Sequence, residues 1–140
     1  MNSLIGTAAV VMVLSVVPAA AQTAATDFGK REYLNNCAVC HGTMGKGDGP
    51  AGMYTTPPAA DLTTISKRSK GVFPFVRVYQ VIDGTQATKW HGTREMPIWG
   101  KEYSKEGWKD WPILGTSKDI ESYVQGRIVA LIGYIHSLQE

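Results

Sequence analysis

The chain has 140 residues, of which 44% are hydrophobic and 19% are charged, and its formal net charge is only +2. This length fits one small folded domain, and the charge alone gives no reason to expect a nucleic-acid or membrane partner. The sequence contains no internal repeat and no low-complexity tract, so we expect a single domain.

The first residues resemble an export signal. Residues 4–17 form an uncharged apolar run, followed by Pro18 and three small alanines that end at Ala21. This pattern is typical of a signal peptide, although no Lys or Arg precedes the run. The run is shorter than the roughly 20 residues that span a bilayer, so an uncleaved segment would be a marginal anchor. We predict a signal peptide over residues 1–21, a domain over residues 22–140, a periplasmic location and no membrane span after cleavage.

A helix is predicted from about residue 27 to Val39, with Thr26 or Asp27 as its cap. Gly29, Tyr33 and Cys37 are spaced four residues apart and therefore share one face of this helix. A glycine on that face lets another helix approach closely, and Tyr33 offers it an aromatic contact.

The most informative motif is Cys37-x-x-Cys40-His41, which contains both cysteines of the chain. It is the attachment signature of a c-type haem, because two thiols one turn apart reach the two vinyl groups on one haem edge. His41 then lies under the ring as the proximal iron ligand. A zinc site is an alternative, but it usually needs a second Cys or His pair. A thioredoxin-like pair is another, and it has no use for His41. We predict one covalent haem c with its iron.

Residues 42–70 are rich in Gly, Pro, Thr and Lys and predict a long loop that wraps around the haem edge. The basic cluster Lys67-Arg68-Lys70 within it is either an ordinary solvated surface or a patch that steers an acidic redox partner.

Two later helices are predicted. Pro74 opens the first, over residues 75–82, and Gly84 ends it, with a strand as the alternative. The second runs from Lys118 to Leu138 behind a Ser117 cap and shows apolar residues at helical spacing. Its two interior glycines predict close packing, because each costs about 1 kcal/mol relative to alanine. These glycines are Gly126 and Gly133.

Met96 is the candidate for the sixth iron ligand. Met44 and Met53 follow His41 too closely to reach the opposite haem face, and Pro97 favours an extended backbone at Met96. A core methionine is the ordinary alternative. Two histidines are rivals for the same position, and a second histidine ligand would lower the potential. They are His91 and His136.

Four tryptophans lie near Met96 in the sequence, at positions 90, 99, 108 and 111. These tryptophans are expected to pack against the haem and to use each indole N–H on a buried acceptor, and Trp99 is taken as the cofactor-binding candidate. Trp108 and Trp111 form either a cover over the haem or a docking surface.

Taken together, these pieces resemble the class I cytochrome c family over nearly all of the exported chain. The face of Gly29 and Tyr33 is similar to the family's first helix, and Leu131-x-x-Tyr134 is similar to the helix it crosses. Glu95-Met96-Pro97 matches the family's methionine ligand. Cys-His-Gly followed by Gly45-x-Gly47-Asp48-Gly49-Pro50 is similar to many bacterial members, and Pro50 then supplies the carbonyl that accepts from the proximal histidine.

The resemblance implies an all-α cytochrome c fold of three to five helices around one haem. It also implies a periplasmic single-electron carrier with His41 and Met96 as axial ligands, and not an enzyme. The partners would be a dehydrogenase or respiratory complex as donor, and an oxidase or other acceptor. Two alternatives stay open: a gas-binding or peroxidase-like protein with distal groups among His91, Arg94 and Glu95, and a dedicated cytochrome subunit of a dehydrogenase complex.

Overall fold

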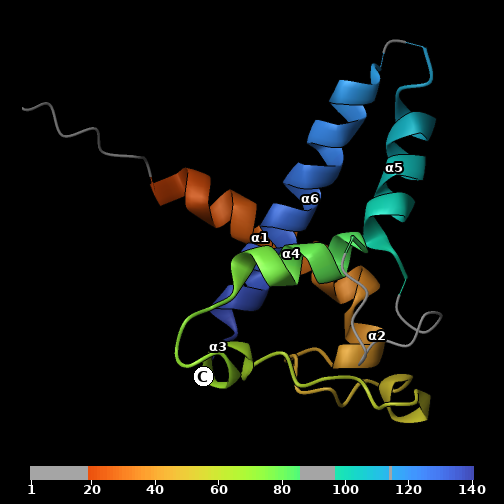
Figure 1. Ribbon diagram of the computed structural model, residues 1–140. Helices are drawn as coiled ribbons and strands as arrows, with labels where there is room; N and C mark the ends of the chain where they lie inside the picture. The colour runs from red at the N-terminus through yellow and green to blue at the C-terminus, as the bar shows by residue number, and fades with distance from the viewer. Residues whose placement is uncertain (1–18, 86–96, 114) are drawn as a thin grey trace, which may run out of the picture.

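The computed structural model describes residues 19–85, 97–113 and 115–140. Within these ranges the chain forms six α-helices and one 3-10 turn, without a strand (Figure 1). This confirms the all-α prediction, with four long helices where three to five were expected and two further helices of a single turn. The elements are α1 (Ala19–Asn36), α2 (Ala38–His41), η1 (Gly52–Tyr54), α3 (Ile65–Arg68), α4 (Phe75–Asp83), α5 (Trp99–Asp110) and α6 (Ser117–Ser137).

The first helix is longer at its start than predicted. α1 begins at Ala19, so it does not start at a Thr26 or Asp27 cap. The residues of α1 before Thr26 are rich in alanine, which has the highest helix propensity. At its other end α1 stops at Asn36, and α2 resumes the helical path one residue later. The amide of Cys37 still donates to the Tyr33 carbonyl at 2.8 Å, which joins the two helices across the break.

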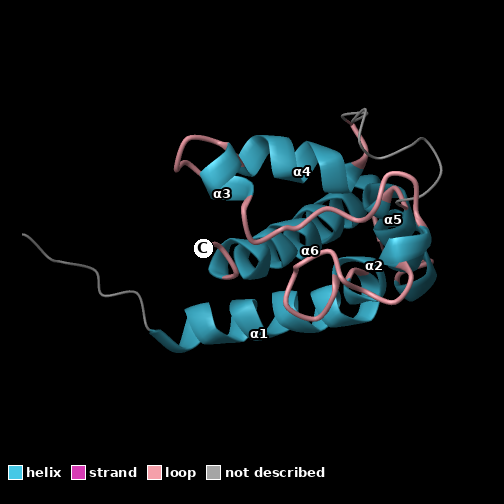
Figure 2. Cartoon of the chain, turned by 90° about the horizontal axis from the view of Figure 1, so that it is seen from below, coloured by secondary structure: helices cyan, strands magenta, loops and turns pink. Residues whose placement is uncertain are grey.

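α1 and α6 pack against each other at the centre of the molecule (Figures 1 and 2). A Cβ atom on Gly29 would lie 2.0 Å from the backbone oxygen of Ala130, so the two helices touch backbone to backbone at this point. One turn further along, the rings of Tyr33 and Tyr134 lie 5.2 Å apart. The predicted contact between the first and last helices is therefore confirmed. Its fully buried side chains include Tyr33, Ile128, Leu131 and Ile132.

α4 lies across α6 (Figure 1). It begins at the predicted residue and ends at Asp83, one residue later than predicted. Pro74 is its N-cap residue. Gly84 ends it in the left-handed conformation, with φ of 86°, which glycine adopts without steric cost. The strand alternative for this segment is therefore wrong.

The start of α6 differs from the prediction by one residue. Thr116, and not Ser117, is the cap, because its hydroxyl accepts from the Asp119 amide at 3.2 Å. The Asp119 carboxylate in turn accepts from the Thr116 amide at 2.8 Å, which completes a capping box.

The prediction of close packing at the two glycines of α6 is wrong. A Cβ atom on Gly126 or Gly133 would meet nothing within 4 Å, and both residues are exposed. The contact surface of α6 is instead carried by Ala130 and by the buried residues on its other face.

α5 was not predicted and lies alongside α6 (Figure 1). The two helices approach at Gly107, where a Cβ atom would lie 3.1 Å from Ile120 and Tyr123. Arg127 of α6 also bonds to Glu106 of α5 and to Glu32 of α1, so one partly buried cation joins three helices. None of the described helices has the length and apolar character needed to cross a bilayer.

Candidate haem site

Cys37 and Cys40 lie on one turn of backbone at the junction of α1 and α2. The amides of Cys40 and His41 both donate to the Cys37 carbonyl, at 3.1 and 2.9 Å. Cys37 is buried and Cys40 is half-buried, and neither forms a disulfide. Burial raises the pKa of the Cys37 thiol to about 12, so this thiol is neutral. Both sulfur atoms are therefore available for covalent attachment of one group.

His41 is buried directly behind this pair. Its Nδ1 lies 2.9 Å from the backbone oxygen of Ala60. A carbonyl oxygen can only accept, so Nδ1 carries the proton and the lone pair of the ring is on Nε2. Burial lowers the pKa of His41, and this outweighs the opposite effect of the Ala60 hydrogen bond. The side chain is thus a neutral imidazole, which is the form that binds a metal.

Pro50 does not have the role that was predicted for it, because Ala60 supplies the carbonyl. The loop after His41 folds back onto α2, where the amides of Gly49 and Ala51 donate to the carbonyls of Cys40 and Val39 at 3.1 and 2.9 Å. This turn leaves Pro50 exposed, away from the histidine ring. No side-chain signal could have identified Ala60, since its contribution is a backbone atom.

Cys37 and His41 lie on the wall of a cavity of about 630 Å³. Such a volume is within the usual range of cofactor sites, and the lining is mainly apolar. The wall is built from the α1–α2 junction, the loop over residues 57–69, α4, the start of α5 and α6. The apolar side chains that α4, α5 and α6 contribute are Val78, Val81, Ile82, Trp99, Leu131 and Ile135, and Pro74 lines the cavity just before α4.

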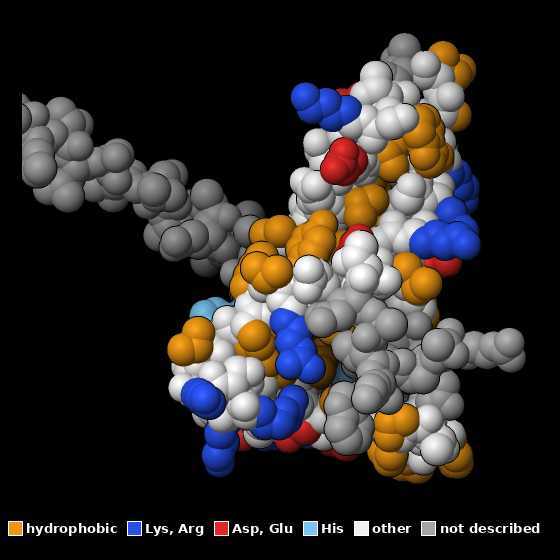
Figure 3. All heavy atoms as spheres, in the orientation of Figure 1, with side chains coloured by type: hydrophobic (Ala, Val, Ile, Leu, Met, Phe, Trp, Pro, Cys, Tyr) orange, Lys and Arg blue, Asp and Glu red, His pale blue; other side chains and the backbone are white. Residues whose placement is uncertain are grey.

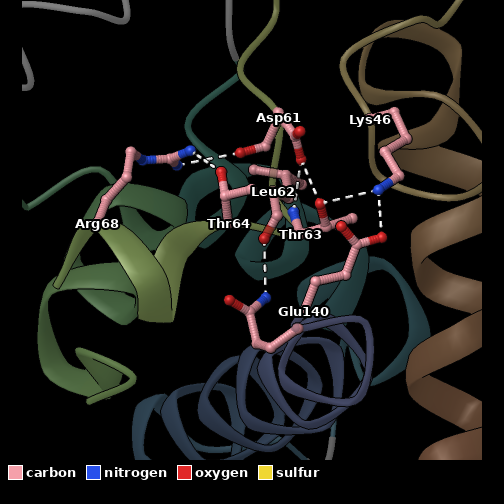
Figure 4. Close-up of polar contacts among 8 residues, drawn as sticks. Lys46, Asp61, Leu62, Thr63, Thr64, Arg68 and Glu140 are labelled. Atoms are coloured by element: carbon pink, nitrogen blue, oxygen red, sulfur yellow. Dashed lines mark hydrogen bonds and ion pairs between the residues drawn. The ribbon is translucent and has the colours of Figure 1, made fainter. Parts of the chain in front are cut away.

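Two cations line the same cavity, Arg68 at the end of α3 and Arg77 on α4. Arg68 donates to the Thr64 hydroxyl and to the Asp61 carbonyl, the latter at 3.0 Å (Figure 4). Hydrogen bonds from Thr63 lower the pKa of Asp61 and keep its carboxylate ionised. Helical spacing could have identified Arg77 as a residue of the cavity wall. It lies one residue before Val78 and four before Val81, and all three residues line the cavity.

Trp99, the candidate cofactor-binding tryptophan, lines the cavity from the first turn of α5. Its ring centroid lies 5.6 Å from that of Tyr103, which is fully buried. The structure therefore places Trp99 where it would contact a bound group. Several other candidates lie outside the described residues: Met96, Trp90, His91, Arg94 and Glu95.

The remaining candidates do not line this cavity. His136 is exposed on α6, and its ring lies tilted by 57° against that of Phe73, with 4.8 Å between centroids. Trp111 meets the ring of Tyr123 edge to face at 5.1 Å, and Trp108 lines a separate groove between α4, α5 and α6. Both tryptophans are about two-fifths exposed, at 43% and 44%, so their position favours a surface role over a cover for the cavity.

A haem fits this set of residues. The cavity provides apolar walls for the macrocycle, and its wall includes the Cys37 thiol and a neutral imidazole. Cys40 does not line the cavity, but it lies on the same turn of backbone as Cys37. Arg68 and Arg77 provide charge for two propionates. By contrast, within the described ranges no three His, Cys, Asp or Glu side chains gather at one point, so these residues assemble no tetrahedral zinc site.

Comparison with known proteins gives one match. The family described as Cytochrome c matches residues 27–112, which include the cysteine pair, His41 and most of the cavity wall. Neither the curated proteins nor the solved structures contain a match to this chain.

Proposed function

Since this chain belongs to the cytochrome c family, whose members carry a covalent haem c with its iron, we propose that it is a single-electron carrier of the bacterial periplasm. The family's function is haem-based electron transfer, and its members are typically carriers and not enzymes. One observation supports the proposal most strongly: Cys37 and His41 lie together on the wall of a mainly apolar cavity.

Each side chain of the site has a distinct task in this proposal. When bound, the haem supplies an iron that takes up and releases one electron. Cys37 and Cys40 hold it through thioethers that do not depend on its oxidation state. His41 presents Nε2 to the metal, and the Ala60 carbonyl orients the ring through Nδ1. The apolar wall excludes water, which favours a raised potential.

Met96 is proposed as the second axial ligand. It precedes Trp99, which lines the cavity, by three residues in the sequence, and Pro97 favours an extended backbone at Met96. Histidine and methionine together raise the potential of a haem relative to two histidines.

Export after Ala21 and the identity of the partners are part of the same proposal. The donor would be a dehydrogenase or respiratory complex, and the acceptor an oxidase or another electron acceptor. Figure 3 shows Lys and Arg side chains gathered around α3. Lys67, Arg68 and Lys70 are exposed there, and they suit an acidic partner surface. The partner's association rate should then fall as salt is added.

The test is whether haem attaches to both cysteines and transfers one electron. The full chain, with its signal, is expressed in a bacterium that attaches haem to exported proteins, and the intact mass is measured after acid extraction of free haem. We expect the mass of the chain from Gln22 plus one haem, and a redox titration with one-electron slope. C37A and C40A should each lose one thioether and yield less haem-loaded protein. Complete removal of haem by acid from the unmodified chain would contradict the proposal.

A further inference from the structure

The side chain of Gln139, just after α6, makes three hydrogen bonds. Its Oε1 accepts from the Ser66 amide at 2.9 Å, and its Nε2 donates to the Leu62 carbonyl at 2.8 Å and to the Ile135 carbonyl at 2.9 Å. Both N–H donors of the amide group are thus in use. The side chain bridges the end of α6 and the loop that lines the haem cavity.

The segment that Gln139 holds starts immediately after Ala60, the acceptor for His41. Three consecutive carbonyls follow, and each accepts a hydrogen bond. The bonds to the Asp61 and Leu62 carbonyls are drawn in Figure 4. Arg68 donates to the Asp61 oxygen at 3.0 Å, Gln139 to that of Leu62, and the Glu140 amide to that of Thr63 at 3.0 Å. The Leu62 amide also donates to the Gly45 carbonyl at 2.6 Å.

Among these contacts, the Gln139 side chain bonds both the start of the segment after Ala60 and the helix α3 that follows it. It bonds Leu62, two residues after Ala60, and Ser66 in the first turn of α3. Arg68 belongs to the loop itself and cannot tie it to α6. The ion pair between Lys46 and Glu140 is largely exposed, at 41% and 60%, so it contributes little.

We propose that Gln139 is a positioning residue for the proximal histidine: it fixes the loop that carries the Ala60 carbonyl and so keeps the His41 hydrogen bond formed. This inference rests on the proposed function, in which His41 binds the iron. A hydrogen bond at Nδ1 increases the electron donation of the other ring nitrogen, which stabilises the ferric state. Loss of the bridge should therefore raise the reduction potential.

The test compares Q139M with Q125M in haem-loaded protein. Methionine keeps the length of the side chain and removes its hydrogen bonds. Gln125 is the matched control, because it is exposed on α6 and its side chain donates to Glu121 on its own helix, at 3.3 Å. We expect Q139M to have a higher reduction potential, altered haem-methyl NMR shifts in the ferric form, and faster solvent exchange of the His41 Nδ1 proton in the ferrous form. Q125M should match the unmodified protein in all three.

Two results would overturn the inference. Q139M could lower the free energy of unfolding and leave the potential, the NMR shifts and the proton exchange equal to those of Q125M, which would make Gln139 a stabilising contact only. Alternatively, Q125M could change the three signals as much as Q139M does. If Q139M yields no haem-loaded protein, Q139N is measured in its place, because it keeps the amide on a stem too short to bridge Leu62 and Ser66. If instead the proposed function is wrong, the chain without any substitution will itself carry no covalent haem.

Discussion

Gly29 of α1 lies directly against the backbone oxygen of Ala130 in α6, at a point where a Cβ atom would be only 2.0 Å from that oxygen. This contact sets how closely the helix that ends at the cysteine pair can approach the helix that supplies Leu131 and Ile135 to the cavity. The approach of these two helices thus determines the shape of the haem site.

Replacing Gly29 should therefore destabilise the protein. The added methyl group meets backbone atoms, which cannot move aside as a side chain can, so G29A should lower the free energy of unfolding by about 2–3 kcal/mol. Guanidinium unfolding of the haem-loaded protein measures this. The matched control is G126A on α6, where nothing lies within 4 Å. This change should raise the stability by about 0.5–1 kcal/mol, because alanine favours a helix over glycine. Equal effects of the two substitutions would disprove the packing role of Gly29.

The hydroxyl of Tyr33 connects the same helix to the loop behind His41. It is fully buried and donates to the Gly42 carbonyl at 2.6 Å. Because that carbonyl also accepts from the Gly45 amide, Y33F should cost about 1 kcal/mol of unfolding free energy and no more than that. Y54F is the control, since Tyr54 is 83% exposed and should show no change. If Y33F left the free energy of unfolding unchanged, this hydrogen bond would not stabilise the loop.

Arg127 of α6 forms a largely buried ion pair with Glu32 of α1 and a more exposed one with Glu106 of α5. Its Nη2 lies 2.6 Å from Glu32 Oε2, each side chain is only 11% exposed, and its guanidinium lies 4.0 Å from the centre of the Tyr103 ring. R127M should lower the free energy of unfolding at neutral pH by about 3–5 kcal/mol, because Glu32 would stay buried without a cation.

The matched control for R127M is K105M. Lys105 forms an exposed pair with Glu102, at 60% and 42% exposure, and its loss should change the stability by less than about 0.5 kcal/mol. If R127M were as mild as K105M, the three-helix junction would depend on packing alone.

Met96 is tested by the substitution M96A. Removing a thioether ligand should lower the reduction potential and open the iron to carbon monoxide. M53A is the control, because Met53 is 65% exposed at η1 and does not line the cavity. Carbon monoxide binding and potentiometry compare the two variants, and an M96A protein with the properties of M53A would mean that another residue is the ligand.

The features that the sequence predicted best depend on local spacing. Helical periodicity places Gly29 and Tyr33 on one face of the first helix, and the resemblance to the cytochrome c family pairs that face with Tyr134. α4 was predicted from Pro74, its apolar spacing and Gly84, which together specify a start, a face and an end. The motif around His41 carries its own geometry, so the family could be expected from it.

What sequence patterns could not predict depends on contacts between distant segments. The acceptor for His41 is a backbone carbonyl 19 residues away, and the choice between Pro50 and Ala60 follows from how the loop folds back on α2. Gly126 was expected at a close contact, but helical position alone does not reveal whether a neighbour is present. α5 is polar on average, and Tyr103 and Gly107 are its buried residues, so few apolar positions mark it as a helix in the sequence.

The measurement that tests the central claim most directly is the optical spectrum of the purified haem-loaded protein, oxidised and then reduced, with and without carbon monoxide. The account predicts a weak far-red band in the oxidised form, due to sulfur ligation, and a sharp low-spin reduced spectrum that carbon monoxide does not change. A high-spin spectrum that shifts with carbon monoxide would contradict it and indicate an open iron suited to gas binding or peroxide chemistry. A low-spin spectrum without the far-red band would contradict the assignment of Met96 and point to a second histidine.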